Sequence, residues 1–239
     1  MPRNLVYISA LDGFAEDFPL GIETWKKYCE RLGLDFYVET ERDKVISNKV
    51  NGSWYPWSSY YLYDRFFDNV LIVDADTMVR WNAPNIFDVA TADFNVVKDS
   101  SPLEYGAIPH LDQWRSSYHV SMPPENYFNA GMMVLSHDSY FKIRAGLSGF
   151  REVSESIGAS SWGQTPVNLL AWENFGTSIN YLPVIWNDMI GFNYEEGDTS
   201  FINRSFLWHF TGPNFQLDKV KRKRLMEQAY SLGAHNYEV

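Results

Sequence analysis

Short apolar runs alternate with stretches of helical periodicity through the first part of the chain. The apolar runs predict strands over Leu5–Ser9 and Asp35–Val38. Between them, Leu20–Leu32 has apolar residues at the three- and four-residue spacing of a helix, and Gly33 is its expected terminator. A third strand, rich in β-branched residues, is predicted to end at Asp74.

The rest of the chain predicts further, mostly short elements. They are an aromatic helix from about Trp57 to Phe67, a helical turn over Asn85–Val89, strands over Phe94–Val97, Met132–Leu135, Asn180–Leu182 and Phe206–Phe210, and helices over Gly163–Trp172 and about Leu217–Leu232. Strands that alternate with helices favour an α/β fold with a parallel or mixed sheet. No repeat and no composition shift divides the 239 residues, so one domain over 1–239 is predicted.

The alternation loosens between Ser100 and Asn126. This stretch contains four prolines together with Tyr105, His110 and Trp114. Long loops within compact domains usually carry function. We therefore predict a loop that faces the substrate.

Composition narrows the class of partner. The net charge of -10 argues against a general nucleic-acid or anionic-membrane surface, because both need a basic face. Aromatic residues make up 17% of the chain, which fits a folded domain. A basic cluster between Lys219 and Arg224 falls on the predicted C-terminal helix, where a solvated helix face is the favoured interpretation and phosphate or acceptor binding is the alternative.

Cysteine usage and hydropathy bear on the compartment. Cys29 is the single cysteine, so no intrachain disulfide can form. No stretch reaches the length of about 18 apolar residues that a membrane span needs. A reduced, cytoplasmic setting is the expectation.

The third strand runs directly into Asp74-Ala75-Asp76. If the strand conformation persists, the two carboxylates point the same way and repel each other. A hard divalent cation would relieve that repulsion. Ligands of open α/β sheets gather outside the carboxyl ends of the strands, so the pair is a candidate metal site.

Four later segments follow the aspartate pair in order. The chain reads Tyr-Phe-Asn-Ala-Gly-Met-Met-Val-Leu at 127–135, Gly-Gln-Thr-Pro-Val-Asn at 163–168, Leu-Pro-x-x-Trp-Asn at 182–187 and Trp-His-Phe-Thr-Gly at 208–212. We interpret Asn-Ala-Gly as a turn that feeds the following strand. With the Asp-x-Asp strand, this order resembles the GT-A glycosyltransferases, and most of all glycosyltransferase family 8, the glycogenin and galactosyltransferase-like group.

The resemblance extends from Leu5 to about Phe215 and implies a Rossmann-like, mostly parallel sheet flanked by helices. It implies that Asp74 and Asp76 bind a metal, Mn²⁺ or Mg²⁺, with His209 as the third protein ligand. That metal would bridge the two phosphates of a nucleotide-sugar donor. By the same resemblance, residues 1–99 form a nucleotide-binding half and residues 100–239 an acceptor-binding half.

The resemblance also implies which residues contact the donor. They are Tyr7, Ser9 and Asp12 around the base and ribose, Arg65 before the metal strand, Ala75 within the aspartate pair, Ala130 and Gly131 beside the sugar, and Gly212 near the phosphates. Asn129 and Gln164 are expected at the reacting sugar. The implied reaction is metal-dependent transfer of a hexose, from a UDP-sugar, to a hydroxyl of a saccharide or protein acceptor, with retention at the anomeric carbon.

Three departures from the family pattern keep alternatives open. The basic residue that the family commonly has before the metal strand has no clear counterpart, because Ser58 and Ser59 occupy its usual region and Arg65 is the nearest candidate. Gly163 stands where the family often has an aspartate, so a carboxylate near the donor sugar is missing. The family's lysine after His-Phe-x-Gly is also absent, and Lys219 or Lys221 are candidates to replace it. These losses favour a second hypothesis, a nucleotide-sugar-binding module with reduced or no turnover. A third hypothesis is a nucleotidyltransferase, which needs a glycine-rich, basic loop after the first strand. The segment 10–14 is not such a loop, which argues against this hypothesis.

Overall fold

The computed structural model describes residues 2–42, 55–157, 163–195, 197–212 and 219–234. Its centre is a six-stranded sheet of order β2-β1-β3-β6-β5-β7. The strands are β1 (Asn4–Ser9), β2 (Asp35–Glu39), β3 (Asn69–Asp74), β5 (Phe94–Lys98), β6 (Phe128–Ser136) and β7 (Asn180–Tyr181). Only β6 runs antiparallel to its neighbours in this sheet, so the prediction of a mixed, mostly parallel sheet is confirmed.

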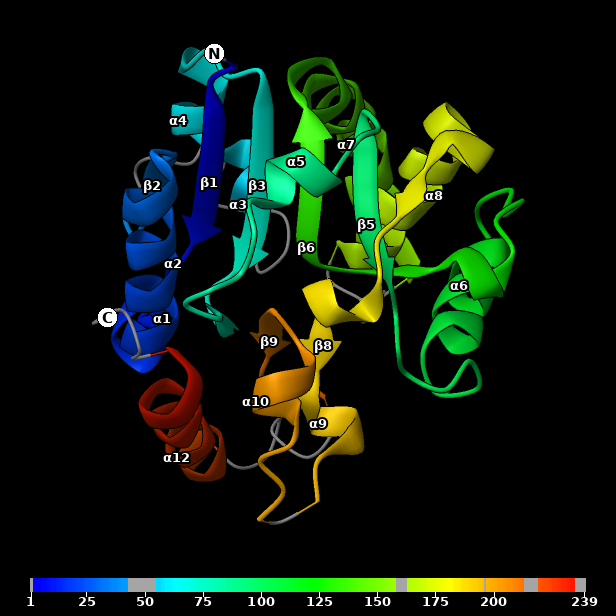
Figure 1. Cartoon of the computed structure of the whole chain (residues 1–239). Coiled ribbons are helices and arrows are strands. Elements are labelled where there is room, and N and C mark those ends of the chain that lie inside the picture. Colours follow the sequence, from blue (N-terminus) through cyan, green and yellow to red (C-terminus); the bar gives the residue numbers. More distant parts are fainter. Residues whose placement is uncertain (1, 43–54, 158–162, 196, 213–218, 235–239) are drawn as a thin grey trace.

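A second sheet continues from the end of β3. It has the order β4-β9-β8 and consists of β4 (Thr77–Val79), β9 (Leu207–His209) and β8 (Asp188–Met189). Figure 1 shows β9 and β8 beyond the lower ends of the main-sheet strands. The residues that join β3 to β4 therefore lie where the two sheets meet.

Helices surround the two sheets, and α9, α10 and α12 lie on the side of the second sheet (Figure 1). Those in the first half are α1 (Phe14–Asp17), α2 (Pro19–Leu32), α3 (Tyr55–Ser58), α4 (Tyr60–Asp64) and α5 (Ile86–Val89). Those in the second half are α6 (Ala107–Arg115), α7 (His137–Ile157), α8 (Gln164–Phe175), α9 (Ile190–Asn193), α10 (Phe201–Arg204) and α12 (Lys219–Ala229), which a π-helical segment extends over Tyr230–Ala234.

Residue alternation along β1 and β3 builds a core on each face of the sheet. Val6 and Ile8 point into one cluster, which contains Trp25 of α2. Leu5 and Tyr7 point into the other, which contains Ile143 of α7. Burial on both faces is the reason why these strands read as continuous apolar runs. Within the described part of the chain, each helix is too short or too polar to span a bilayer.

The structure corrects the predicted loop over 100–126. Residues Ala107–Arg115 form α6, whose Ala107, Leu111 and Trp114 are buried. Pro109 does not prevent this helix, because it lies in the first turn, where backbone N–H groups have no intrahelical acceptor.

Three other element predictions were incomplete. The aromatic helix is two helices, α3 and α4, because Ser59 between them is the N-cap of α4 and accepts a hydrogen bond from Leu62 N. Helix α7 was not predicted, although Tyr140, Ile143 and Leu147 follow a helical spacing and are buried. The helix predicted from Leu217 is described from Lys219 onward, so its predicted start lies outside the described residues.

Candidate metal centre and adjoining cavity

Asp74, Asp76 and His209 converge where the two sheets meet. β4 pairs antiparallel with β9, so that Thr77 is opposite His209. His209 Nε2 lies 3.3 Å from Asp76 Oδ1 and 3.7 Å from Asp74 Oδ2. One ligand atom from each of the three residues lies within 4.8 Å of the others. Two carboxylate oxygens and one imidazole nitrogen are a suitable donor set for a divalent ion such as Mn²⁺ or Mg²⁺.

The route by which the carboxylates converge differs from the prediction. β3 ends at Asp74, and Ala75 and Asp76 form a turn before β4. The turn, rather than strand alternation, brings the two side chains to the same side. Asp76 is also tied to the second sheet, because its backbone carbonyl accepts a hydrogen bond from Phe210 N at 3.0 Å.

The charges of the three residues are coupled. Burial of the carboxyl group raises the pKa of Asp74 to about 6, although half of its side-chain surface is exposed; His209 lowers this pKa and Asp76 raises it. Burial lowers the pKa of His209, but the neighbouring carboxylates of Asp76 and Asp74 outweigh it, so that the net shift is upward. A divalent cation favours the deprotonated form of every ligand.

Asn187 sets the orientation of the histidine ring. His209 Nδ1 lies 3.0 Å from Asn187 Oδ1, an acceptor, which places the proton on Nδ1 and leaves the Nε2 lone pair toward the carboxylates. Asn187 Nδ2 in turn donates to Asn129 Oδ1 at 3.0 Å. Asn187 belongs to the Leu-Pro-x-x-Trp-Asn segment, but the sequence did not indicate this contact.

Gly131 has no side chain, and the space beside it is filled by the side chains of His209 and Asp74. A Cβ atom on Gly131 would lie 2.2 Å from His209 Cε1 and 2.9 Å from Asp74 Oδ2. Asn129, Ala130 and Gly131 belong to β6 itself, so the predicted turn is wrong. The pairing of β6 with β5 is irregular at this point, where its register shifts between Val96 and Val97.

Gln164 joins β6 to the end of β5. Its Oε1 accepts hydrogen bonds from Ala130 N at 3.2 Å and from Asn129 Nδ2 at 3.3 Å, and its Nε2 donates to Asp99 Oδ2 at 3.2 Å. A carboxylate therefore does lie beside Gln164, although Gly163 precedes it. Asp99, which no sequence motif singled out, supplies it from a distant part of the chain.

A cavity of about 310 Å³ adjoins these residues. Asp99, Asn129 and Gln164 line one part of it, and Thr211 and Gly212 line another. Tyr105 and His110, from the segment predicted to face the substrate, also line this cavity. Burial lowers the pKa of His110, and the charge of Asp99 opposes that shift.

The end of β1 lies next to the candidate metal centre. Ser9 pairs in register with Asp74 on one side and with Glu39 on the other. Asp12 follows in a left-handed conformation, with φ of 61°, and forms a bidentate ion pair with Arg42 at 2.6 Å. The side chain of Tyr7 is fully buried in the core, so it supports this edge from beneath and does not face the cavity.

Arg65 does not join the other predicted site residues. It is the C-cap of α4, and its guanidinium lies 4.7 Å from the ring of Tyr61. Figure 1 shows α4 beside the N-terminal end of β1, whereas Asp74 ends its strand at the opposite edge. Because Arg65 precedes β3 in the sequence, it lies near the start of this strand, whereas Asp74 lies at its end.

The fold is shared with solved glycosyltransferase structures, although sequence identities are low. A glycosyltransferase involved in the glycosylation of the major capsid of PBCV-1 matches with a TM-score of 0.67 and 13% identity, over 95% of this chain and 100% of that chain. Galactosyltransferase LgtC, in complex with donor and acceptor sugar analogs, matches with a TM-score of 0.58 and 14% identity, over 95% and 96%.

A third similar structure is the glycosyltransferase GlyE of Streptococcus pneumoniae TIGR4, with a TM-score of 0.59 and 11% identity, over 96% of this chain and 60% of that chain. No protein-family model and no curated protein sequence matches the chain. The three-dimensional similarity therefore carries the comparison, and the chain has the GT-A glycosyltransferase fold.

Proposed function

We propose that the protein is a metal-dependent glycosyltransferase that moves a hexose from a nucleotide sugar to an acceptor hydroxyl. The observation that carries the proposal is the convergence of Asp74, Asp76 and His209 at the strand ends, beside a cavity, in a fold shared with glycosyltransferases. UDP is the favoured nucleotide, retention the favoured outcome, and a saccharide or a protein the favoured acceptor. These details follow from the family resemblance.

The donor set fits a divalent cation, and Asp74, Asp76 and His209 would hold it. When bound, the cation would neutralise charge on the departing nucleoside diphosphate. Asn187 keeps the imidazole of His209 in the tautomer that a metal ligand needs. Gly131 keeps the ligand side chains close together, because no side chain intrudes between His209 and Asp74.

The remaining contacts with the donor are proposed from where each predicted residue lies in the fold. Ser9, Asp12 and the backbone of Ala75 lie at the edge where the nucleoside would bind, in the half spanning residues 1–99. In the second half, Gly212 lines the cavity and has a φ of 115°, and a Cβ there would lie 2.9 Å from the carbonyl carbon of Gly191. Its backbone is thus suited to a close approach to phosphate.

Gln164 and Asn129 are assigned to the transferred sugar. Their amides are held by each other and by Asp99, which leaves a rigid polar wall on the cavity. Tyr105 is assigned to the acceptor, since it lines the cavity yet is 82% exposed. An exposed aromatic ring at the mouth of a polar cavity suits the apolar face of a sugar ring.

The test is metal-dependent binding followed by turnover. Purified protein would be titrated with UDP, GDP and other nucleoside diphosphates, with and without Mn²⁺, and then assayed for hydrolysis of and transfer from the matching nucleotide sugars. Asp76→Asn should abolish Mn²⁺-dependent nucleotide binding and lower turnover by more than about a hundredfold, because a metal ligand is lost.

Asp138→Asn is the matched control, because the Asp138 side chain is fully exposed on α7. It should leave binding and turnover unchanged. Nucleotide binding by Asp76→Asn that equals the parent would refute the metal site. Binding without turnover on any donor would favour the non-catalytic binding module instead.

A further inference from the structure

Four aromatic rings form a continuous cluster at the surface, beside α4 and the start of α7. The distances between ring centres are 6.3 Å for Tyr63 and Phe141, 4.7 Å for Phe141 and His137, and 5.5 Å for His137 and Phe66. Tyr63 is 57% exposed and Phe66 is 63% exposed. Large apolar side chains that are exposed side by side usually mark an interaction site. We call this cluster the aromatic surface.

The aromatic surface is held in position by the structure beneath it. Arg144 Nε donates to the carbonyl oxygen of Trp57 at 2.8 Å, and Arg144 Cζ lies 4.4 Å from the centre of the Tyr63 ring. His137 packs edge-on against the buried ring of Phe67, with 5.3 Å between ring centres. Side chains that are already ordered lose little conformational entropy when a partner binds.

The aromatic surface lies at the edge of the main sheet that is opposite to the candidate metal centre. The backbone N–H of His137 donates to the carbonyl oxygen of Asp68 at 2.9 Å, directly before β3 begins. Asp74 lies at the other end of β3. A partner bound to the aromatic surface would therefore leave the candidate metal centre and its cavity open.

Charges of both signs surround the rings. Asp64 and Asp138 are acids next to them in the sequence, and Arg65 and Arg144 are bases. Within the described part of the chain, neither Asp64 nor Asp138 forms an ion pair with a lysine or an arginine. The whole chain carries a net charge of -10, so two copies repel each other over most of their surfaces. The local balance of charge removes this repulsion at the aromatic surface.

The charges also suit contact of this surface with itself. In a dimer with two-fold symmetry, the same surface of each copy forms the interface. A surface that carries both acids and bases can then place the acids of one copy beside the bases of the other, which is electrostatic complementarity without a second kind of chain.

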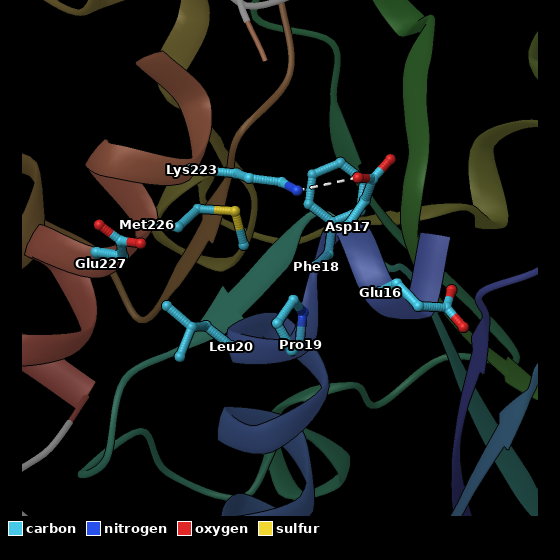
Figure 2. Close-up of a pocket in the computed structure, with 8 residues that line it drawn as sticks. All are labelled: Glu16, Asp17, Phe18, Pro19, Leu20, Lys223, Met226 and Glu227. Atoms are coloured by element: carbon cyan, nitrogen blue, oxygen red, sulfur yellow. Dashed lines mark hydrogen bonds and ion pairs between the residues drawn. The ribbon is translucent and has the colours of Figure 1, made fainter. Parts of the chain in front are cut away.

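A second apolar hollow lacks this balance of charge. It is a cavity of about 270 Å³ between α12 and the start of α2. Figure 2 shows apolar side chains there among three acids, Glu16, Asp17 and Glu227, and one base, Lys223. The excess of acids would oppose association with a second copy of an acidic chain.

We propose that the aromatic surface is the interface of a homodimer, in which it packs against the same surface of a second copy. An aromatic side chain can bury about 150–250 Å², so the rings would form the apolar centre of an interface that needs about 800 Å² from each partner. The polar and charged side chains of α4 and α7 would form the rim. The dimer is independent of the proposed reaction, because the candidate metal centre lies at the opposite edge of the sheet.

The test measures molecular mass by sedimentation equilibrium over a wide range of protein concentration. The parent would be compared with Phe66→Asp, with Phe66→Leu, which keeps an apolar side chain, and with the control Phe14→Asp. The ring of Phe14 is 46% exposed and lies on α1, which Figure 1 shows far from α4. Urea unfolding would show that each variant is folded.

The parent should sediment with the mass of two chains. Phe66→Asp should weaken the dimer by more than about a hundredfold, because each dimer would bury two unpaired carboxylates. Phe66→Leu should weaken it much less, and Phe14→Asp should behave as the parent.

Three results would overturn the proposal. The first is a parent that sediments as one chain at every concentration. The second is a dimer that Phe14→Asp weakens as much as Phe66→Asp does. The third is a parent that is a single chain and binds phosphatidylcholine vesicles, with binding lost in Phe66→Asp, since the aromatic surface would then contact lipid. Each of these results leaves the proposed glycosyltransferase function untouched.

Discussion

At the scale of single residues, the geometry of the candidate metal centre depends on the lack of a side chain at Gly131. Gly131 lies beside His209 and Asp74, and a Cβ atom there would overlap both. Neither neighbour can retreat easily, because Asn187 fixes the imidazole and Asp74 ends a buried strand. We predict that Gly131→Ala lowers Mn²⁺ affinity by more than about tenfold, the scale at which disturbed ligand geometry acts.

The measurement is a Mn²⁺ titration followed by electron paramagnetic resonance, with circular dichroism to confirm the fold. Gly149→Ala is the matched control, because a Cβ at Gly149 meets nothing within 4 Å. Gly149 lies in α7, so this control should keep Mn²⁺ affinity and gain up to about 1 kcal/mol of stability. Equal loss of Mn²⁺ binding in both variants would contradict the steric explanation.

A second prediction at this scale concerns Glu39. This residue lies at the end of β2 and is only 1% exposed. Burial raises its pKa above the ordinary value, and hydrogen bonds from Ser59 and Tyr37 offset part of that shift. A raised pKa in the folded state means that this group contributes stability at low pH, and that the contribution is lost as pH rises through the folded pKa.

Glu39→Gln, which mimics the protonated form, should therefore increase the free energy of unfolding at about pH 7 and change it little at about pH 4. Urea unfolding of the parent and the variant at both pH values measures the difference. Glu30→Gln on the exposed face of α2 should show no such dependence on pH. A gain for Glu39→Gln that is the same at both pH values would show that charge is not its cause.

At the scale of elements, α2 holds the β3–β4 turn in position. Trp25 Nε1 donates to Thr77 Oγ1 at 2.9 Å, and Thr77 Oγ1 donates to the carbonyl oxygen of Asp74 at 2.6 Å. The contact is close because Gly21 has no side chain. A Cβ there would lie 2.5 Å from the carbonyl oxygen of Ala75 and 2.6 Å from that of Thr77.

Gly21→Ala should push the helix and the turn apart. Overpacking of this kind destabilises proteins by about 1–3 kcal/mol, and here it should also weaken Mn²⁺ binding, because the turn carries Asp76. Urea unfolding and Mn²⁺ titration test the two effects. Lys26→Ala, at an exposed position of the same helix, is the control, and an unchanged Mn²⁺ affinity in Gly21→Ala would separate α2 from the site.

The same scale shows how far local patterns predict this fold. β1, α2 and β3 could be predicted because their apolar spacing reflects the faces that they bury. α7 was missed because Gly146, Gly149 and several serines dilute its periodicity, and tertiary packing makes it a helix. α6 was missed because the prolines in and around it are usually signals of a loop.

The site was predictable where its residues lie within one segment or a recognisable motif. Asp74, Asp76 and His209 were predicted in this way, and the structure brings them together. The partners that complete the site come from pairings across the chain: Asn187 is 22 residues from His209, Asp99 is 65 from Gln164, and Arg222 is 146 from Asp76. Such contacts depend on sheet order and helix docking, which no local pattern contains.

At the scale of the whole molecule, the site joins both halves of the chain. The β3–β4 turn belongs to the first half, whereas β6, α8 and β9 belong to the second. A ligand that binds only the folded protein stabilises it, by about 2.7 kcal/mol at a concentration 100 times its dissociation constant. Because the ligand would contact both halves, protection should appear in distant segments at once.

Hydrogen exchange followed by mass spectrometry tests this expectation. Adding Mn²⁺ and UDP together should slow exchange in three segments at the same ligand concentration, namely residues 74–79, 128–131 and 207–212. Residues 60–67, around α4, lie at the opposite edge of the sheet and should not change. EDTA should reverse the protection, and His209→Ala should show none, because its metal centre is incomplete.

Protection confined to 74–79 would mean that the nucleotide engages only the first half. The second half would then lie near the site without contacting the nucleotide, and assigning Gly212 and β6 to the donor would be wrong.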